Sequence, residues 1–360
     1  MKSYPQRSPN ELLLVRLAEN RWSGALERWL RAACAGGVIL DTPLPRSAGA
    51  THELAANIAR VTSPLPFLAV REEGGNEGAL GVFLPALPSL RFVANKGVPA
   101  VARLGELIGE ALSLLGFNTN FAPALDLATP FTEKTLGAHA FSADPRQVAE
   151  CGGAFARGLR QHKIRACGKH FPGWGSVPVD ALQGLAVSGK SMAALWREDL
   201  FPFRELLPQL PMVQVSSAAY KAYDFDIPRA ASLSPAVVEG LLRIRLGYRG
   251  LALAYDLEDQ NVRGTLDLGQ AAIQAINAGC DLIIVDQGTS FDTVSQALQA
   301  GLDAGKLAPK RLEESLERIR IGQKGLTPPK GKIAKSALDE LARRFERFSS
   351  EFSREELKIA

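Results

Sequence analysis

Cysteine is scarce in this chain, and the few cysteines stand far apart. There are four among 360 residues, and no two of them form a Cys-x-x-Cys pair: Cys34, Cys151, Cys167 and Cys280. A disulfide framework or a cysteine-rich metal site needs more closely spaced cysteines. We therefore expect separate structural thiols in a reducing compartment and no metal site.

Long apolar runs are missing as well. No stretch reaches the roughly 18 consecutive apolar residues of a membrane-spanning helix. The N-terminal segment 1–9 has no apolar stretch of the kind that a secretory signal peptide requires. We therefore expect a cytoplasmic protein with no membrane contact.

An excess of one charge sign is also lacking. The chain has 42 basic and 38 acidic residues, a formal net charge of +4, and neither sign gathers in a long block. A nucleic-acid-binding surface needs a concentrated basic patch. The composition therefore predicts a mixed, solvated surface and no nucleic-acid partner.

What the chain does contain is an alternation of short apolar runs with segments of helical spacing. Runs of four to six residues are typical of buried parallel strands. Strands are expected at 37–40, 66–70, 120–125, 164–169, 212–216, 251–255 and 282–285, and helices at 10–33, 51–61, 97–115, 145–162, 191–207, 234–246, 266–278 and 290–323. Seven or eight such units without hairpin signals predict an α/β fold, a (β/α)8 TIM-barrel-like barrel. No Gly-x-Gly-x-x-Gly follows the first expected strand, which disfavours a dinucleotide-binding sheet, and we expect no cofactor.

The composition changes after residue 326. Residues 327–360 are highly charged and have helical spacing. We expect a barrel domain over 1–326 and a charged helical C-terminal tail over 327–360. The tail is expected to be solvated or to face a protein partner through 331–360.

The stretch 166–182 places Lys169 and His170 at the end of an expected strand, before a loop rich in Gly and Pro. Such a strand end delivers polar side chains to the mouth of an α/β barrel. From Lys169 to Gly173 the chain resembles the Lys-His-Phe-Pro-Gly-His-Gly signature of glycoside hydrolase family 3, in the β-N-acetylhexosaminidase branch. Further elements resemble that family in order over roughly 30–324: Gly36–Leu40 its first strand, Glu73–Gly75 its Asp-Gln-Glu-Gly-Gly-Arg, Asn120–Pro123 with Asp126 its Asn-Phe-Ala-Pro-x-x-Asp, Gly137–Pro145 its Gly-x-Arg-x-Phe-x-x-Asp-Pro, Leu246–Gly250 the segment before its nucleophile, and Ala278–Asp281 its Ala-Gly-x-Asp.

The resemblance implies an α/β barrel that hydrolyses glycosides of N-acetylglucosamine in two steps. In the family a carboxylate attacks the anomeric carbon and forms a covalent glycosyl-enzyme. A histidine, oriented by an aspartate two residues earlier, protonates the leaving oxygen and later activates water. An arginine, an aspartate and the Lys-His pair hold the sugar.

The chain departs from the family at the residues that carry this chemistry. The Asp-Ser-His element reads Asp180-Ala181-Leu182, so the orienting carboxylate is kept while the proton carrier is a leucine. The nucleophile position is Tyr255, and Asp256 matches the next carboxylate. Neighbouring strand residues point to opposite sides, so Asp256 does not inherit the role unless the strand end bulges. The sugar-holding positions are substituted too: Arg71 stands for Asp, Asn76 and His139 for Arg, Trp174 and Ser217 for His.

These departures favour a catalytically impaired family member with a remodelled, more basic pocket for a small saccharide or an anionic ligand. The candidate ligand-binding residues are Lys169, His170, Arg71, His139, Asp126 and Trp174, and the candidate catalytic carboxylates are Asp256 and Asp180. Lys169 and His170 have an equally supported structural role, in which they pair internally with Glu73 or Asp126. Two alternatives stay open: an active β-N-acetylhexosaminidase that uses Asp256, and a barrel that serves as a scaffold for a protein partner.

Overall fold

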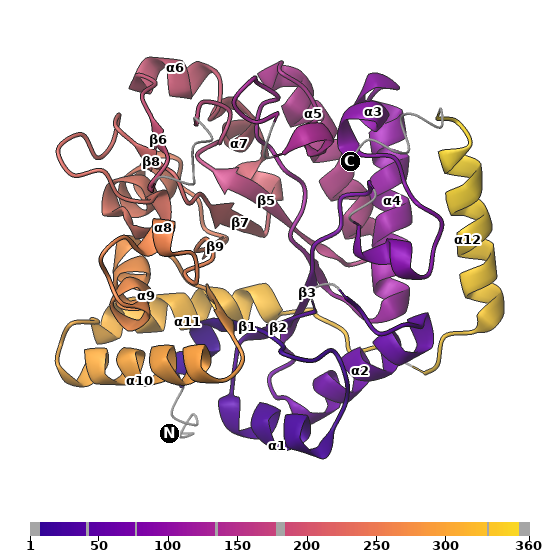
Figure 1. Ribbon diagram of the computed structural model, residues 1–360, viewed down its shortest axis with the longest axis horizontal. Helices are drawn as coiled ribbons and strands as arrows, with labels where there is room; N and C mark the ends of the chain where they lie inside the picture. Colours follow the sequence, from indigo (N-terminus) through magenta and orange to yellow (C-terminus); the bar gives the residue numbers. More distant parts are fainter. Residues whose placement is uncertain are drawn as a thin grey trace.

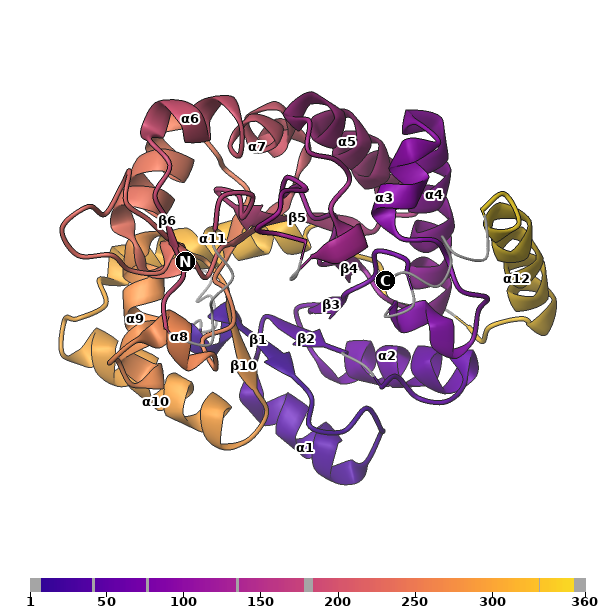
Figure 2. The same cartoon turned by 45° about the horizontal axis from the view of Figure 1, so that its top comes forward.

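Eight parallel strands form a nearly closed barrel at the centre of the molecule (Figures 1 and 2). The computed structural model describes residues 8–40, 43–75, 78–133, 136–177, 184–329 and 331–352. In barrel order the strands are β10 (Ile283–Asp286), β1 (Leu13–Arg16), β2 (Gly37–Ile39), β3 (Phe67–Val70), β4 (Thr119–Asn120), β5 (Arg165–Phe171), β7 (Met212–Val215) and β9 (Leu251–Leu253). A bridge between Leu253 and Leu282 brings the two edges together. This confirms the predicted (β/α)8 barrel.

Most of the strands form because their residues are apolar on both faces. All four residues of β3 are buried, since one face lines the barrel interior and the other packs against helices. Gly37 in β2 shows how tight the packing is. A Cβ atom there would lie 2.8 Å from the carbonyl oxygen of Phe67 and 2.5 Å from Leu14, so a larger side chain does not fit.

The expectation of one helix over 10–33 is wrong. That segment holds a 3-10 turn η1 (Pro9–Leu12), strand β1, and a helix α1 (Gly24–Ala33) that begins at the capping residue Ser23. The residues from Leu12 to Val15 are fully buried, and β1 pairs with β10 on one side and β2 on the other. These long-range contacts favour a strand, although the apolar spacing also fits a helix. As a result, the segment that resembles the family's first strand is β2, the second strand here.

Two other expected helices are each divided. The segment 290–323 forms α10 (Thr289–Asp303) and α11 (Pro309–Gln323), because Gly305 has a positive φ of 70° and Pro309 starts a new helix. The segment 191–207 forms α6 (Met192–Arg197) and α7 (Phe201–Leu206).

The remaining helices surround the barrel (Figure 1). They are α2 (Ala48–Val61), α3 (Leu90–Asn95), α4 (Val98–Leu115), α5 (Pro145–Gln161), the π-helix η7 (Ala236–Arg245), α8 (Gln260–Arg263) and α9 (Leu268–Ala278). Short 3-10 turns are η2 (Ala79–Val82), η3 (Gly137–His139), η5 (Leu207–Gln209) and η6 (Ala231–Leu233), and a small parallel pair joins β6 (Val187–Ser188) to β8 (Ala219–Tyr220). Among the described residues, no helix combines the length and the apolar character needed to cross a bilayer.

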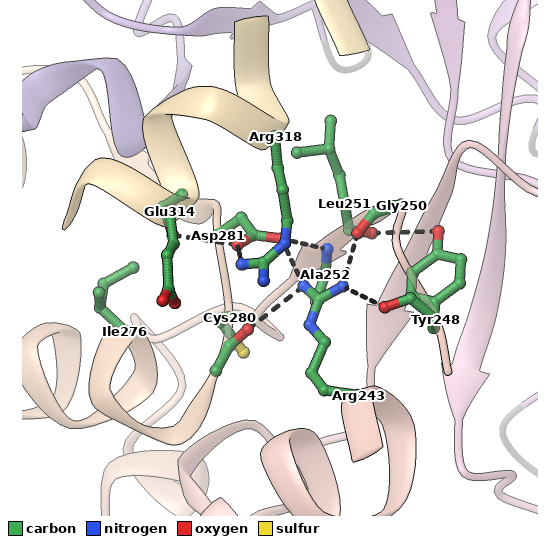
Figure 3. A network of polar contacts seen from close by, with 12 residues as sticks. Arg243, Tyr248, Gly250, Leu251, Ala252, Ile276, Cys280, Asp281, Glu314 and Arg318 are labelled. Atoms are coloured by element: carbon green, nitrogen blue, oxygen red, sulfur yellow. Dashed lines mark hydrogen bonds and ion pairs between the residues drawn. The ribbon is translucent and has the colours of Figure 1, made fainter. Parts of the chain in front are cut away.

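A buried carboxylate, Asp281, joins the elements at the seam where the barrel closes (Figure 3). It lies between α9 and β10 and accepts a hydrogen bond from the amide of Ala252 in β9 at 3.0 Å. Arg243 of η7 pairs with one carboxylate oxygen, while Arg311 and Arg318 of α11 pair with the other at 3.0 and 3.1 Å. Burial opposes ionisation of Asp281, but the three guanidinium charges outweigh it and hold its pKa below the usual 3.8.

The tail forms a helix, α12 (Lys335–Ser349), that lies along the outer side of α4 (Figures 1 and 2). Its helical character was predicted, and the expected solvation applies to one face only, because Leu341, Phe345 and Phe348 on the other face are buried. Arg344 of α12 pairs with Glu110 of α4. The apolar face of the tail is therefore covered by the barrel, and the division into two domains at residue 326 stays a prediction.

Candidate functional site

A cavity of about 880 Å³ opens at the carboxyl ends of the barrel strands. Three strand ends contribute most of its polar lining: residues 71–73 follow β3, Lys169 and His170 lie within the last three residues of β5, and Tyr255 follows β9. Trp174, from the Gly-rich loop after β5, and His139, from η3, complete it. Because parallel strands all end at the same rim, residues far apart in sequence meet here.

Lys169 is tied to an internal carboxylate. Its Nζ lies 3.1 Å from Oε2 of Glu73 and donates to the carbonyl of Phe121 at 2.8 Å. The other oxygen of Glu73 accepts from the amide of Ala124 at 2.7 Å. His139 lies 3.8 Å from the same carboxylate, and its Nδ1 is buried without a hydrogen-bond partner. Glu73 is thus the acceptor around which two of the predicted ligand-binding residues gather.

His170 is tied to a second carboxylate. Its Nδ1 lies 2.8 Å from Oδ2 of Asp126, which is almost fully buried. The other oxygen of Asp126 accepts from the amide of Trp174 at 2.7 Å. Asp126 therefore stands behind the cavity and orients His170 and the Trp174 loop. The internal pairing considered for Lys169 and His170 is what the structure contains.

Three rings pack together at one side of the cavity. His170 stacks on Trp174 with ring centroids 4.6 Å apart, and Tyr255 lies 5.8 Å from His170 and 5.9 Å from Trp174. Burial raises the pKa of Tyr255 above 10, as do the nearby carboxylates Asp259 and Asp256. The phenol is therefore un-ionised at neutral pH, which makes it a poor nucleophile.

Asp256 is not among the residues that line this cavity. Its Oδ2 forms an ion pair at 2.5 Å with Arg16, the last residue of β1, and Arg16 forms a second ion pair at 2.5 Å with Asp286. Its Oδ1 accepts from the amide of Glu258 at 3.0 Å. The Arg16 cluster (Arg16, Asp256 and Asp286) joins β1, β10 and the end of β9 at the rim of the barrel.

The structure brings six of the eight predicted site residues together at one rim and places a seventh, Asp256, outside the cavity lining. Arg71, His139, Lys169, His170 and Trp174 line the cavity, with Asp126 directly behind. Asp180 and Leu182 lie outside the described residues, as does Asn76. The sequence pattern does not identify Arg16 as a site residue, because it predicts one helix over 10–33. The signal that could identify Arg16 is the apolar run Leu12–Val15 directly before it, which is like the runs of the other strands. Among the described residues, no group of three or more His, Cys, Asp or Glu side chains is arranged to hold a metal ion.

Glu72 organises the turn that carries Arg71 and Glu73. Its two carboxylate oxygens accept from the amides of Gly74 at 2.6 Å and Leu80 at 2.8 Å. Complete burial raises its pKa from 4.5 to about 7, against the lowering effect of these two amides. The folded protein thus keeps a proton on Glu72 in a pH range where the unfolded chain has lost it.

The variant Glu72→Gln tests this assignment. Because the folded pKa is raised, wild-type stability falls as pH rises from 4.5 to about 7, by up to roughly 3 kcal/mol. Glutamine does not titrate, so the free energy of unfolding of the variant should rise relative to that of the wild type over this pH interval. It should lose about 1 kcal/mol at low pH, where one amide lacks an acceptor. Urea unfolding of both proteins at several pH values measures the difference, and a difference that does not change with pH would contradict the assignment.

A family model described as the glycosyl hydrolase family 3 N-terminal domain matches residues 10–321. Among curated relatives, the beta-hexosaminidase of Pseudomonas aeruginosa is 30% identical over 284 residues, which cover 77% of this chain and 83% of the relative. The beta-hexosaminidase of Methylococcus capsulatus is 30% identical over 315 residues, 85% of this chain and 92% of the relative.

Solved structures agree with the fold. A family 3 glycosyl hydrolase from Mycobacterium smegmatis superposes with a TM-score of 0.80 at 27% identity, covering 90% of this chain and 99% of its own. A family 3 beta-N-acetylglucosaminidase from Paenibacillus superposes with a TM-score of 0.83 at 24% identity, covering 95% of this chain and 68% of its own. The barrel is therefore shared almost from end to end.

Proposed function

This chain belongs to glycosyl hydrolase family 3. We propose that it binds an N-acetylglucosamine-containing saccharide at the mouth of its barrel without hydrolysing it efficiently. The proposal has two halves, a lost reaction and a retained pocket. Each half rests on a different observation and has its own test.

The observation that supports the lost reaction is the pair Tyr255 and Asp256 at the end of β9. The side chain at the nucleophile position is a partly buried, un-ionised tyrosine that packs against His170 and Trp174. The neighbouring carboxylate is turned to Arg16 at the barrel rim. With Leu182 at the position of the proton carrier, neither step of a retaining mechanism has its usual group.

The alternative of an active hydrolase that uses Asp256 has less support. To attack a sugar in the cavity, Asp256 must leave Arg16, with which its Oδ2 forms an ion pair at 2.5 Å. An arginine that forms ion pairs with carboxylates on two other strand ends holds those strand ends together, which is a structural role.

The retained pocket suits a neutral saccharide better than an anion. The anionic ligand was expected from four basic residues: Arg71, His139, Lys169 and His170. Of these, Lys169 and His139 face the carboxylate of Glu73, and His170 is bonded to Asp126. What faces the cavity is a mixture of hydrogen-bonding groups beside the ring surfaces of Trp174 and Tyr255. Aromatic faces pack well on the C–H faces of sugars, and mixed polar groups pair with hydroxyls.

The variant Glu73→Gln separates a saccharide from an anion. Removing this carboxylate deletes a charged acceptor for hydroxyls and leaves Lys169 uncompensated. We expect the affinity for N,N′-diacetylchitobiose to fall about tenfold or more, and the affinity for glucuronate to rise. Titration calorimetry of the wild type and the variant measures both, with the exposed Glu150→Gln on α5 as a matched control.

Wild-type protein that binds glucuronate more tightly than the disaccharide would contradict the saccharide assignment.

The scaffold alternative has the least support, because the apolar face of α12 is already covered by α4 and its exposed face carries ion pairs such as Glu340 with Arg343.

A further inference from the structure

The C-terminal end of α12, together with the residues that follow it up to Phe352 (348–352, called the tail end below), contacts the wall of the cavity. Ser349, the last residue of α12, donates a hydrogen bond from its hydroxyl to the carbonyl of Ala86 at 2.7 Å. Ala86 itself lines the cavity. Ser349 therefore touches the cavity wall from a position more than 250 residues away in sequence, and it is not itself among the residues that line the cavity.

The residues that follow Ala86 contact the turn that carries Glu73 at the cavity. The next residue, Leu87, accepts a hydrogen bond from the amide of Gly75 at 2.9 Å. Gly75 belongs to the turn that carries Glu73. Beside it, a Cβ atom at Gly74 would lie 2.6 Å from the carbonyl oxygen of Pro88, so the two segments pack backbone to backbone. The position of 86–88 thus determines the position of the turn.

Several contacts hold the tail end in place. Arg103 of α4 donates to both carboxylate oxygens of Glu351, and its guanidinium lies 5.0 Å from the ring centre of Phe348. Lys96, which follows α3, lies 5.5 Å from the ring centre of Phe352. Both aromatic side chains are buried. The tail end is therefore docked on α3 and α4, the helices that follow the cavity wall in the chain.

We propose that α12 is a buttress of the cavity wall. Docking of the tail end fixes the segment 86–88 and, through Gly75, the turn that presents Glu73. Phe348 and Ser349 are then positioning residues, which influence ligand affinity without contacting the ligand. The wall contacts stand on their own, whereas the effect on affinity rests on the proposed saccharide binding.

The double variant Phe348→Ala/Ser349→Ala tests the buttress. Hydrogen exchange of peptides within 71–89 should become about fivefold faster or more, with the Gly75 amide as the main reporter. The dissociation constant for N,N′-diacetylchitobiose should rise by a similar factor. Glu340→Ala/Arg343→Ala, on the exposed face of the same helix, should change neither quantity.

A third variant separates positioning from general destabilisation. Phe291→Ala removes a buried ring on α10 that packs against Trp29, away from the tail. It should lower the melting temperature without changing exchange in 71–89 or affinity. Exchange in 71–89 that stays at the wild-type rate in the double variant would overturn the buttress. If the double variant does not fold, Ser349→Ala alone gives the same decision.

The failure of the proposed function is distinguishable from the failure of the buttress. A wild-type protein that does not bind the disaccharide contradicts the proposed function alone, because the exchange measurement needs no ligand.

Discussion

Replacing Asp281 by alanine is expected to destabilise the fold by about 3–5 kcal/mol, the largest loss of stability that we expect from a single substitution. Asp281 is fully buried and is the common partner of Arg243, Arg311 and Arg318. Without it, three guanidinium groups face one another at the barrel seam, and the amide of Ala252 loses its acceptor. The cost is mainly that of uncompensated buried charge.

Urea unfolding at pH 7 measures this loss, with the exposed Asp303→Ala at the end of α10 as a control that should stay within about 0.5 kcal/mol. The loss of unfolding free energy in Asp281→Asn should lie between those of Asp281→Ala and Asp303→Ala, because asparagine keeps the shape of the side chain but not its charge. Because the folded pKa of Asp281 lies below 3.8, the stabilisation by its charge is complete at neutral pH and is lost as pH falls through that lower value. A loss below about 1 kcal/mol for the alanine variant would mean that Asp281 does not hold the seam.

Most strands could be predicted because each is a short apolar run buried on both faces. Phe67–Val70 and Ile283–Val285 are clear examples, and both were placed within a residue or two. β1 was not found, since Leu12, Leu13 and Val15 also fit one face of a helix and only the pairing with β10 and β2 decides between the two. Local spacing does not contain that long-range information.

Lys169 and His170 could be predicted at the barrel mouth from their place at a strand end, whereas Arg71 and Trp174 were identified only through the resemblance to the family. Whether the first two bind a ligand or pair internally depends on distances between loops of different strands, which no local pattern encodes. The Arg16 cluster illustrates this: it joins residues 16, 256 and 286, which meet only when β10 pairs with β1 and the barrel closes. The docking of α12 is similar, because an amphipathic pattern predicts a helix with one apolar face but not the surface that covers it.

Hydrolysis is expected to be absent or nearly so. Loss of a nucleophile or of a general acid each removes several orders of magnitude in rate, and this chain has Tyr255 and Leu182 at those two positions. We expect turnover of an aryl β-N-acetylglucosaminide at least roughly 10⁴-fold below that of the Pseudomonas aeruginosa beta-hexosaminidase assayed beside it. The Asp256→Asn variant should behave like the wild type in this assay, because Asp256 serves Arg16 and not the cavity.

That assay is the most direct test of the proposed function. The account predicts that the wild type and Asp256→Asn release the aryl group at the same rate, at least roughly 10⁴-fold below that of the Pseudomonas aeruginosa enzyme. Turnover by the wild type that Asp256→Asn abolishes would contradict it, and would mean that Asp256 leaves Arg16 to act as the nucleophile.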